Sequence, residues 1–406
     1  MAVGLKSLAK LHPVSGVKIG VAQAGIKYEN RNDLTLFSLC EGANVASVFT
    51  KNRFCAAPVI VAKENLAVSS PRYLLVNTGN ANAGTGPAGK RVSVDCCNGV
   101  ASIAGCKADQ VLPFSTGVIG ELLDESKIIN ALPAAFKNLN DDNWAVAAKA
   151  IMTTDTLPKG CSAQIELDGE IVTITGISKG SGMIRPDMAT MLAYVATDAE
   201  IDAVLLQSLL NKSNRVSFNA ITVDGDTSTN DACILMATGK SKVRLDESSS
   251  EELLATFYQA LESIMQQLAQ SIIRDGEGAT KFITVLVEGG VDTHECEQVA
   301  YTIAHSPLVK TAFFASDPNW GRILAAVGRA GIDDLDIEKL TIKLNDVVIV
   351  EGGDRAASYS EEKGQAVMNQ EEICISVNLA RGVALHTVWT CDLSYDYVKI
   401  NAEYRS

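Results

Sequence analysis

Short apolar runs of two kinds alternate along this chain, and their alternation predicts a fold that mixes strands with helices. The runs 162–167 (SAQIEL) and 171–178 (IVTITGIS) are typical of strands, and the Asp168–Gly169 step between them is a β-hairpin signal. Segment 249–276 instead repeats its apolar residues every three or four positions, as a helix does. With 47% hydrophobic residues among 406, the chain can bury one large core or two. We therefore predict a mixed α/β protein whose large sheets are covered by helices.

The helix expected within 249–276 has a recognisable beginning and end. Ser249 and Glu252 fit a capping box, in which each side chain binds the backbone N–H of the other residue. The pattern stops at Arg274-Asp275-Gly276, where a glycine favours helix termination. The face expected to point inward consists of Leu253, Leu254, Phe257, Leu261, Ile264, Met265, Leu268 and Ile272.

The other elements are predicted from the same two periodicities. A change of pattern near Glu288 suggests a boundary between an N-terminal domain, 1–287, and a C-terminal α/β domain, 288–406. Strands are expected at 43–49, 57–62, 73–77, 190–199, 281–290, 340–345, 347–353, 373–379 and 383–390, and helices at 121–136, at 142–152, from about 202 through 213 and at 294–316.

The charge and hydropathy of the chain exclude several classes of partner. The net charge is −13 and the pI is about 4.9, so attraction to nucleic acid or to an anionic membrane is not expected. No apolar run reaches the roughly 18 residues that would span a bilayer. The first 18 residues lack the continuous apolar stretch of a secretion signal. We expect a cytoplasmic protein.

Cysteine and histidine are placed in ways that argue against a metal site. None of the ten cysteines forms a C-x-x-C pair, and several lie in strand-like runs, where cysteine behaves as a small hydrophobic residue. The four histidines are far apart in sequence. We therefore expect reduced thiols and no metal site.

A glycine-rich segment at 84–91 (GTGPAGKR) nearly matches two phosphate-binding loops. It has the G-x-G-x-x-G spacing and also ends in Gly-Lys, but Arg91 stands where a Walker loop needs serine or threonine. Pro87 removes one backbone N–H from the loop. The following RVSVDCC does not clearly begin a helix, as a dinucleotide site would require. A mobile surface loop is the favoured interpretation, and a nucleotide site at Gly84–Lys90 remains the alternative.

Thr190 begins the strand-like run in 186–199 (PDMATMLAYVATDA) and follows a glycine-spaced approach. The ordinary interpretation is a threonine at the start of a strand. The alternative is a nucleophile that is created when the chain is cut between Ala189 and Thr190. A hydroxyl needs a base to become nucleophilic, and a free α-amine, which titrates at about 7.7–8.0, would supply one on the same residue.

Two further features are compatible with such a nucleophile. Gly180, Gly182 and Pro186 suit a turn that strains the bond to be cut. Catalysis would also need hydrogen-bond donors for an oxyanion, and Thr116 with Gly117 in FSTGVIG offers a hydroxyl and an unhindered backbone N–H. By spacing alone, this pair is one candidate among several.

Six segments spread over nearly the whole chain form a recognisable set. They are MTTDT (152–156), KGSGMIRPDMATML (179–192), TVDGDTSTND (222–231), RDGEGATK (274–281), SDPNWGR (316–322) and DLSYDYVKINAEYRS (392–406). Together and in this order, they resemble the glutamate N-acetyltransferase/ornithine acetyltransferase family of arginine biosynthesis. The combination is far more specific than any single segment.

The resemblance implies a self-cleaving enzyme. Members of this family cut themselves before the threonine of the ATML segment, which here would give an α chain, 1–189, and a β chain, 190–406, commonly assembled as α2β2. The implied fold is a helix-sheet-sheet-helix sandwich like that of self-cleaving aminopeptidases. A smaller C-terminal α/β domain would contribute its tail to the active site.

The implied reaction moves an acetyl group from N-acetylornithine to glutamate through Thr190, without a cofactor or metal. Whether acetyl-CoA also serves as donor is left open. Thr116 and Gly117 match the family's oxyanion residues. The substrate-binding positions of the family correspond to Thr153, Lys179, Thr190, Glu277, Asn401 and Ser406.

The chemistry of these residues agrees with the implied roles. Lys179 suits a substrate carboxylate, Glu277 suits an amine, and Asn401 and Ser406 can hydrogen-bond the α-substituents. Some relatives have threonine in place of Ser406, a change that keeps the hydroxyl. Thr154 remains an alternative to Thr153 as the contact within MTTDT.

Two other functions remain open on the sequence alone. In the first, the same self-cleaved architecture acts as an aminopeptidase and passes the acyl group to water. In the second, the chain is a kinase that binds a nucleotide at Gly84–Lys90. Lys179 and the C-terminal segment argue against the first, and Arg91 and Pro87 argue against the second.

Overall fold

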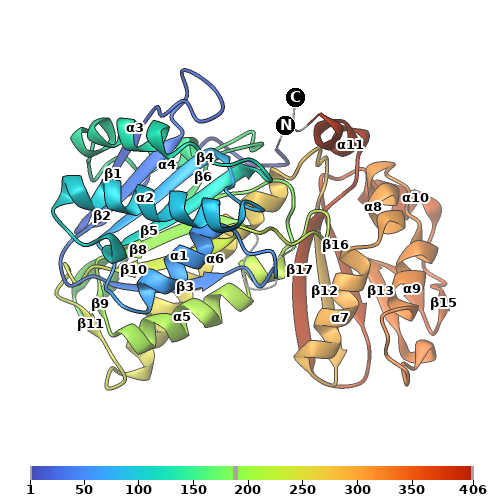
Figure 1. Ribbon diagram of the computed structural model, residues 1–406. Coiled ribbons are helices and arrows are strands. Elements are labelled where there is room, and N and C mark those ends of the chain that lie inside the picture. Colours follow the sequence, from blue (N-terminus) through green and yellow to red (C-terminus); the bar gives the residue numbers. More distant parts are fainter. Residues whose placement is uncertain (1, 186–190, 404–406) are drawn as a thin grey trace.

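The computed structural model describes residues 2–185 and 191–403, and its main body is built from two stacked sheets (Figure 1). One sheet has four strands in the order β1-β2-β4-β5, and the other has five in the order β3-β10-β8-β7-β6. The first comprises β1 Val17–Ala22, β2 Leu34–Leu39, β4 Tyr73–Asn80 and β5 Val111–Val118. The second comprises β3 Asn44–Phe49, β10 Ala232–Ala237, β8 Leu192–Thr197, β7 Glu170–Lys179 and β6 Lys159–Leu167.

Strand β8 shows why the body needs four layers. Successive side chains of a strand point to opposite faces of its sheet. Leu192, Tyr194 and Ala196 belong to the core between the two sheets, whereas Ala193 and Val195 belong to the core on the far side of the five-stranded sheet. All residues of β8 are buried. A strand that is apolar on both faces must be covered on both, and this explains the continuous apolar run in the sequence.

Helices cover the two outer faces and complete a helix-sheet-sheet-helix sandwich, as expected. α5 Ala203–Arg215 and α6 Glu251–Arg274 cover the five-stranded sheet, while α2 Gly86–Ala104 and α3 Glu125–Lys137 cover the four-stranded one. The core between the sheets is anchored by Tyr194, whose ring lies 4.9 Å from that of Phe37 and 5.4 Å from that of Phe114. The body also contains α1 Ala57–Leu66, α4 Trp144–Ala150, the short pair β9 Glu200–Ile201 and β11 Arg244–Leu245, and 3₁₀ turns at Ala108–Gln110 and Phe218–Ala220.

The C-terminal part forms a separate six-stranded sheet with its own apolar core, beside the sandwich (Figure 1). Its strand order is β15-β14-β13-β16-β12-β17. The strands are β12 Phe282–Gly290, β13 Thr341–Leu344, β14 Val347–Glu351, β15 Asp354–Arg355, β16 Glu372–Asn378 and β17 Ala384–Cys391. The helices are α7 Thr293–Ala304, α8 Pro307–Phe314, α9 Trp320–Gly328, α10 Glu361–Met368 and α11 Tyr395–Ala402, with a 3₁₀ turn at Ile337–Lys339. The boundary predicted near Glu288 falls inside β12.

Most of the predicted elements are present, but three local predictions were wrong. Run 57–62 is part of helix α1, not a strand; Pro58 stands in the first turn, where its missing N–H has no intrahelical partner to lose. Segment 84–91 is not a mobile loop, because α2 begins at Gly86. The N-cap of α6 is Ser250, whose side chain accepts from the Leu253 N–H, while Ser249 accepts from Asp246.

Candidate active site

A cavity of about 280 Å³ opens where β5 and β7 end, between the two sheets of the sandwich. It brings together all the predicted site residues that the structure describes. These are Thr116, Gly117, Thr153, Lys179, Glu277 and Asn401. The other predicted positions, Ala189, Thr190 and Ser406, lie outside the described residues. Residues that are far apart in the sequence therefore share one small space.

The predicted oxyanion pair lies near the end of β5, next to β4. Gly117 has a φ of +136° and pairs with Gly79 on the neighbouring strand, where the ladder is irregular. A Cβ on Gly117 would overlap the Gly79 carbonyl group, so only glycine fits at this position. Both Thr116 and Gly117 line the cavity.

Lys179 connects the two sheets at the cavity. It is the last residue of β7, and its Nζ donates to the Thr116 Oγ1 on β5 at 3.2 Å. Burial lowers the pKa of Lys179, and the carboxylates of Asp155, Asp231 and Glu277 oppose that shift only in part. Burial likewise raises the pKa of Asp231 well above its usual value. The site therefore contains a cation that loses its proton more easily than an exposed lysine.

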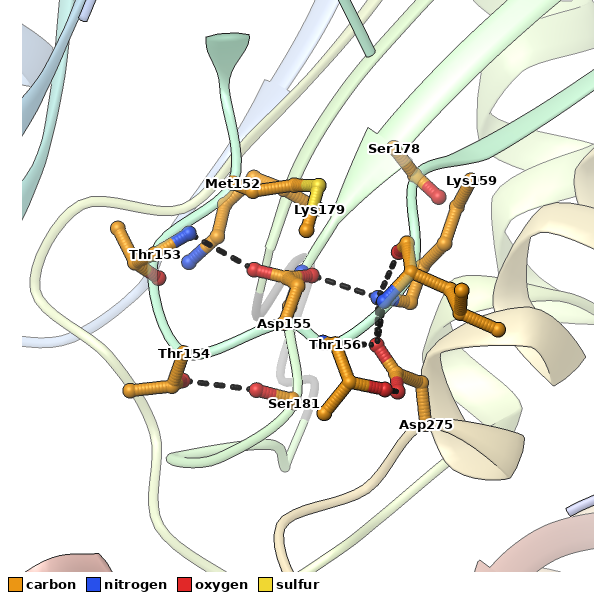
Figure 2. Close-up of polar contacts among 12 residues, drawn as sticks. Met152, Thr153, Thr154, Asp155, Thr156, Lys159, Ser178, Lys179, Ser181 and Asp275 are labelled. Atoms are coloured by element: carbon orange, nitrogen blue, oxygen red, sulfur yellow. Dashed lines mark hydrogen bonds and ion pairs between the residues drawn. The ribbon is translucent and has the colours of Figure 1, made fainter. Parts of the chain in front are cut away.

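A buried ionic network holds together two segments that line the cavity (Figure 2). The Asp155 carboxylate accepts from the Thr153 N–H at 3.0 Å and from the Gly180 N–H at 2.7 Å. The fully buried Lys159 bridges Asp155 at 2.6 Å and Asp275 at 2.7 Å. This network fixes the Thr153 loop against the turn that follows Lys179.

Charge pairing also controls the ionisation of Asp155 within this network. Burial alone would raise the pKa of Asp155, but Lys159 and Lys179 together bring it below its ordinary value. Asp275 extends the network by accepting from the Thr156 N–H at 2.9 Å. The Asp155 carboxylate is therefore held ionised at the centre of this frame.

Glu277 and Asn401 also line the cavity and are bonded to each other. The Asn401 Nδ2 donates to the Glu277 Oε2 at 2.8 Å, and the Glu277 N–H donates to the Ser181 carbonyl at 2.8 Å. Glu277 is buried, whereas Asn401 comes from the C-terminal helix α11. Helix α11 thus docks onto the site.

A second contact holds α11 in place. The Tyr397 hydroxyl donates to the Asp224 Oδ2 at 3.2 Å, and Asp224 also accepts from the Met183 N–H at 2.7 Å and the Ile184 N–H at 2.9 Å. One carboxylate therefore joins the C-terminal helix to the turn that follows Lys179.

The two threonines of MTTDT are in different environments, although both line the cavity. The Thr154 hydroxyl is hydrogen-bonded to the Ser181 hydroxyl at 2.8 Å. Within the described part of the chain, no hydrogen bond engages the Thr153 hydroxyl. Thr153 is therefore the one better placed to offer its hydroxyl to a ligand.

Sequence reasoning missed several residues of this site. Asp155, Lys159 and Asp275 build its frame, and Asn230 lines the cavity while donating to the Ser115 carbonyl at 2.9 Å. Asp155, Asn230 and Asp275 lie in segments that carry the family resemblance, so polar residues of those segments could have been proposed as site residues. Lys159 lies in none of them and had no such signal.

The arrangement suits a small molecule that carries both charges. A lysine, a carboxylate, and hydroxyl and backbone groups all line the same cavity. Within residues 2–185 and 191–403, no group of three or more histidine, cysteine, aspartate or glutamate side chains could hold a metal ion. Nor does any helix in these ranges have the length and apolar character needed to cross a bilayer.

Comparison with known proteins agrees with the resemblance found in the sequence. The model of the ArgJ family matches residues 18–406. The arginine biosynthesis bifunctional proteins ArgJ of Pseudomonas fluorescens and Psychrobacter arcticus are each 56% identical to this chain, over the whole length of both partners.

Two solved structures are also similar. A crystal structure of arginine biosynthesis bifunctional protein ArgJ from Bacillus halodurans is 42% identical and has a TM-score of 0.48, covering 50% of this chain and 95% of that one. The ornithine acetyltransferase of Mycobacterium tuberculosis, complexed with ornithine, is 29% identical and has a TM-score of 0.39, covering 46% of this chain and 98% of that one. On the family match and the full-length relatives, this chain belongs to the ArgJ family.

Proposed function

We propose that this chain transfers the acetyl group of N-acetylornithine to glutamate, and that Thr190 carries the acetyl group between the two. Its family makes it an acyltransferase of arginine biosynthesis, which replaces the aminopeptidase and kinase alternatives. The observation that supports the mechanism is the convergence of Thr116, Lys179, Glu277 and their neighbours on one cavity. Met191, the residue after Thr190, is buried, and its carbonyl accepts from the Ala232 N–H at 2.9 Å.

The nucleophile is made by cutting the chain once. The Thr190 hydroxyl attacks the Ala189 carbonyl, and the acyl group moves from nitrogen to oxygen to give an ester. Water hydrolyses this ester and leaves a carboxylate on Ala189 and a free amine on Thr190. That amine is the base for the adjacent hydroxyl in every later turnover.

The first half-reaction transfers acetyl to the enzyme. The Thr190 oxygen attacks the acetyl carbonyl of N-acetylornithine, and the oxyanion that forms is stabilised by the Thr116 hydroxyl and the Gly117 N–H. Because Lys179 donates to the Thr116 oxygen, the proton of that hydroxyl is free to point at the oxyanion. Breaking the C–N bond, with a proton passed from the Thr190 amine, releases ornithine.

The second half-reaction reverses these steps with a different amine. The amine of glutamate attacks acetyl-Thr190, its proton passes to the Thr190 amine, and the ester breaks to release N-acetylglutamate. Lys179, Thr153, Asn401 and Ser406 hold the substrate's polar groups, and Glu277 holds the ammonium group of the ornithine side chain.

The relatives are named bifunctional, and we assign this chain a second activity as well. In that activity acetyl-CoA replaces N-acetylornithine as the acetyl donor to glutamate. The working form is an α2β2 assembly in the cytoplasm. Supplying glutamate and acetyl-CoA without N-acetylornithine tests the second activity directly.

Cleavage provides the simplest test of the mechanism. Denaturing electrophoresis of the purified protein should show two fragments, 1–189 and 190–406, whereas the Thr190→Ala variant should remain one inactive piece. A variant that still divides at this bond would rule out Thr190 as the cleaving residue.

A further inference from the structure

A second cavity lies beside the catalytic one and has no role in the mechanism above. It measures about 180 Å³ and shares Gly117, Val118, Thr153 and Thr154 with the catalytic cavity. Its outer wall is the loop before β2, which contributes Lys27 and Arg31. We call this space the Lys27–Arg31 lobe. It is a side chamber of the active site, not a separate surface pocket.

The loop that carries Lys27 is held in a defined position. The Asp33 carboxylate accepts from the Ala24 N–H at 2.6 Å and from the Ile26 N–H at 2.7 Å, while the Lys127 Nζ donates to the Gly25 carbonyl at 2.8 Å. These bonds fix the backbone immediately before Lys27.

Lys27 also packs directly onto the strand next to the oxyanion pair. A Cβ built on Gly79, which has a φ of +98°, would lie 3.0 Å from the Lys27 Cβ. Because Gly79 pairs with Gly117, the base of the Lys27 side chain is placed one strand away from the predicted oxyanion pair.

Arg31 ties the lobe to the substrate loop. Its guanidinium donates to the Met152 carbonyl, which directly precedes Thr153. A guanidinium has five N–H donors in a fixed plane, so a bond to one carbonyl leaves donors that can bind a carboxylate or phosphate. Two acidic residues also line this lobe: Asp33, whose carboxylate accepts from two backbone N–H groups, and Glu403.

The proposed reaction needs two sites for substrate side chains, one that prefers a positive charge and one that prefers a negative charge. The side chain of N-acetylornithine ends in an ammonium group, whereas that of glutamate ends in a carboxylate. Glu277 is a buried carboxylate that attracts the first and repels the second. An anionic substrate group is better accommodated in the neighbouring lobe, where Lys27 and Arg31 are.

We propose that the Lys27–Arg31 lobe binds an anionic group of a substrate that the ornithine half-reaction does not use. The group is either the side-chain carboxylate of glutamate or a phosphate of acetyl-CoA, since both are recognised by the same donors. This inference rests on the proposed function. On this inference, the lobe recognises the second substrate, whereas the residues of the catalytic cavity acetylate Thr190.

The test uses Lys27→Met, which keeps most of the length of the side chain and removes its charge, and Lys27→Arg, which keeps the charge. Losing one charge-assisted hydrogen bond should raise the KM of the substrate whose anionic group sits there by about 10-fold, with kcat little changed. Lys27→Arg should restore most of the affinity. Lys137→Ala, an exposed lysine near the end of α3, is the matched control.

Separate assays distinguish the two sources of the anionic group. A higher KM for glutamate with N-acetylornithine as donor identifies the carboxylate, and a higher KM for acetyl-CoA alone identifies the phosphate. The release of ornithine in the first turnover, measured without glutamate, should be unchanged in Lys27→Met. If the carboxylate binds there, the preference for glutamate over glutamine should also narrow in this variant.

Two outcomes would overturn the inference. One is an unchanged KM for both glutamate and acetyl-CoA in Lys27→Met, and the other is slowed ornithine release in that variant. Failure of the proposed function itself would look different, because wild-type enzyme incubated with N-acetylornithine would then carry no acetyl group on Thr190.

Discussion

At the scale of single residues, the site is defined by buried charges that depend on one another. Lys159 does not line the cavity, yet it pairs with Asp155, which positions Thr153 and Gly180, and with Asp275, which holds the Thr156 N–H. Removing one partner of such a buried pair leaves an uncompensated charge, which typically destabilises a protein by about 3–5 kcal/mol. The frame is therefore more sensitive to substitution than the exposed ion pairs of the surface.

Lys159→Met should lower the midpoint of thermal unfolding markedly and reduce activity, because Asp155 and Asp275 would lose their shared cation. Glu170→Gln, which breaks the exposed Lys242–Glu170 pair, should leave the midpoint close to that of the wild type. Thermal scans of both variants at neutral pH measure the difference. Equal midpoints for Lys159→Met and wild type would contradict the assigned role of the network.

The lowered pKa of Asp155 predicts the direction of the acid dependence of stability. A carboxyl whose pKa is lower in the folded than in the unfolded state stabilises the fold above its unfolded value, near 3.8, and this contribution is lost as the pH falls through the folded value. Wild-type protein should thus lose stability more steeply below pH 3.8 than Asp155→Asn does. Denaturant titrations at several pH values measure the free energy of unfolding of both proteins. If the prediction is wrong, the two plots of this free energy against pH will be parallel.

The lowered pKa of Lys179 predicts an alkaline limit on substrate binding. Loss of the proton removes the cation that holds the substrate carboxylate, so the KM for N-acetylornithine should rise at a pH below 10.5, the ordinary lysine value. Lys179→Arg keeps its charge throughout and should move that rise to higher pH. KM is measured against pH for both proteins. Because the substrate titrates in the same way in both assays, the difference between the two profiles reports on the enzyme. Coincident profiles would show that Lys179 does not set the limit.

At the scale of elements, the sequence signals succeeded where one element alone carries the pattern. The β6–β7 hairpin and helix α6 were predicted because an Asp-Gly turn and a long helical periodicity are local features. Helix α1 was missed because its run of valine and isoleucine is equally typical of a buried strand, and only packing against the sheet decides between the two. The beginning of α2 was missed because glycine and proline are usual in loops.

Helix α11 is the element whose docking completes the site, and the Tyr397–Asp224 bond is its anchor. Tyr397→Phe should raise the KM for N-acetylornithine several-fold, because Asn401 would be less firmly held beside Glu277. Hydrogen exchange in 395–402 should speed up in the same variant. Tyr395→Phe, on the same helix but 84% exposed, is the control and should leave both measurements unchanged. Similar rates of hydrogen exchange in the two variants would show that the Tyr397–Asp224 bond does not hold α11 in place.

At the scale of the whole molecule, the mixed α/β class followed from periodicity, while the order of the four layers came from the family resemblance. No spacing rule could place Thr116 beside Lys179, because they lie on different sheets that meet only in the folded core. The Lys27–Arg31 loop had no sequence signal at all, since its position depends on Gly79 and Asp33. The site residues were found by resemblance, and their supporting frame was found only from the structure.

The central claim is that the two chemical steps share one residue, Thr190. Peptide mass spectrometry of active enzyme, quenched after mixing with N-acetylornithine and no glutamate, tests it most directly. We predict a fragment that begins at Thr190 and carries a single acetyl group on that residue, which disappears when glutamate is added. An intact active chain, or an acetyl group that turns over on any other side chain, would contradict the account.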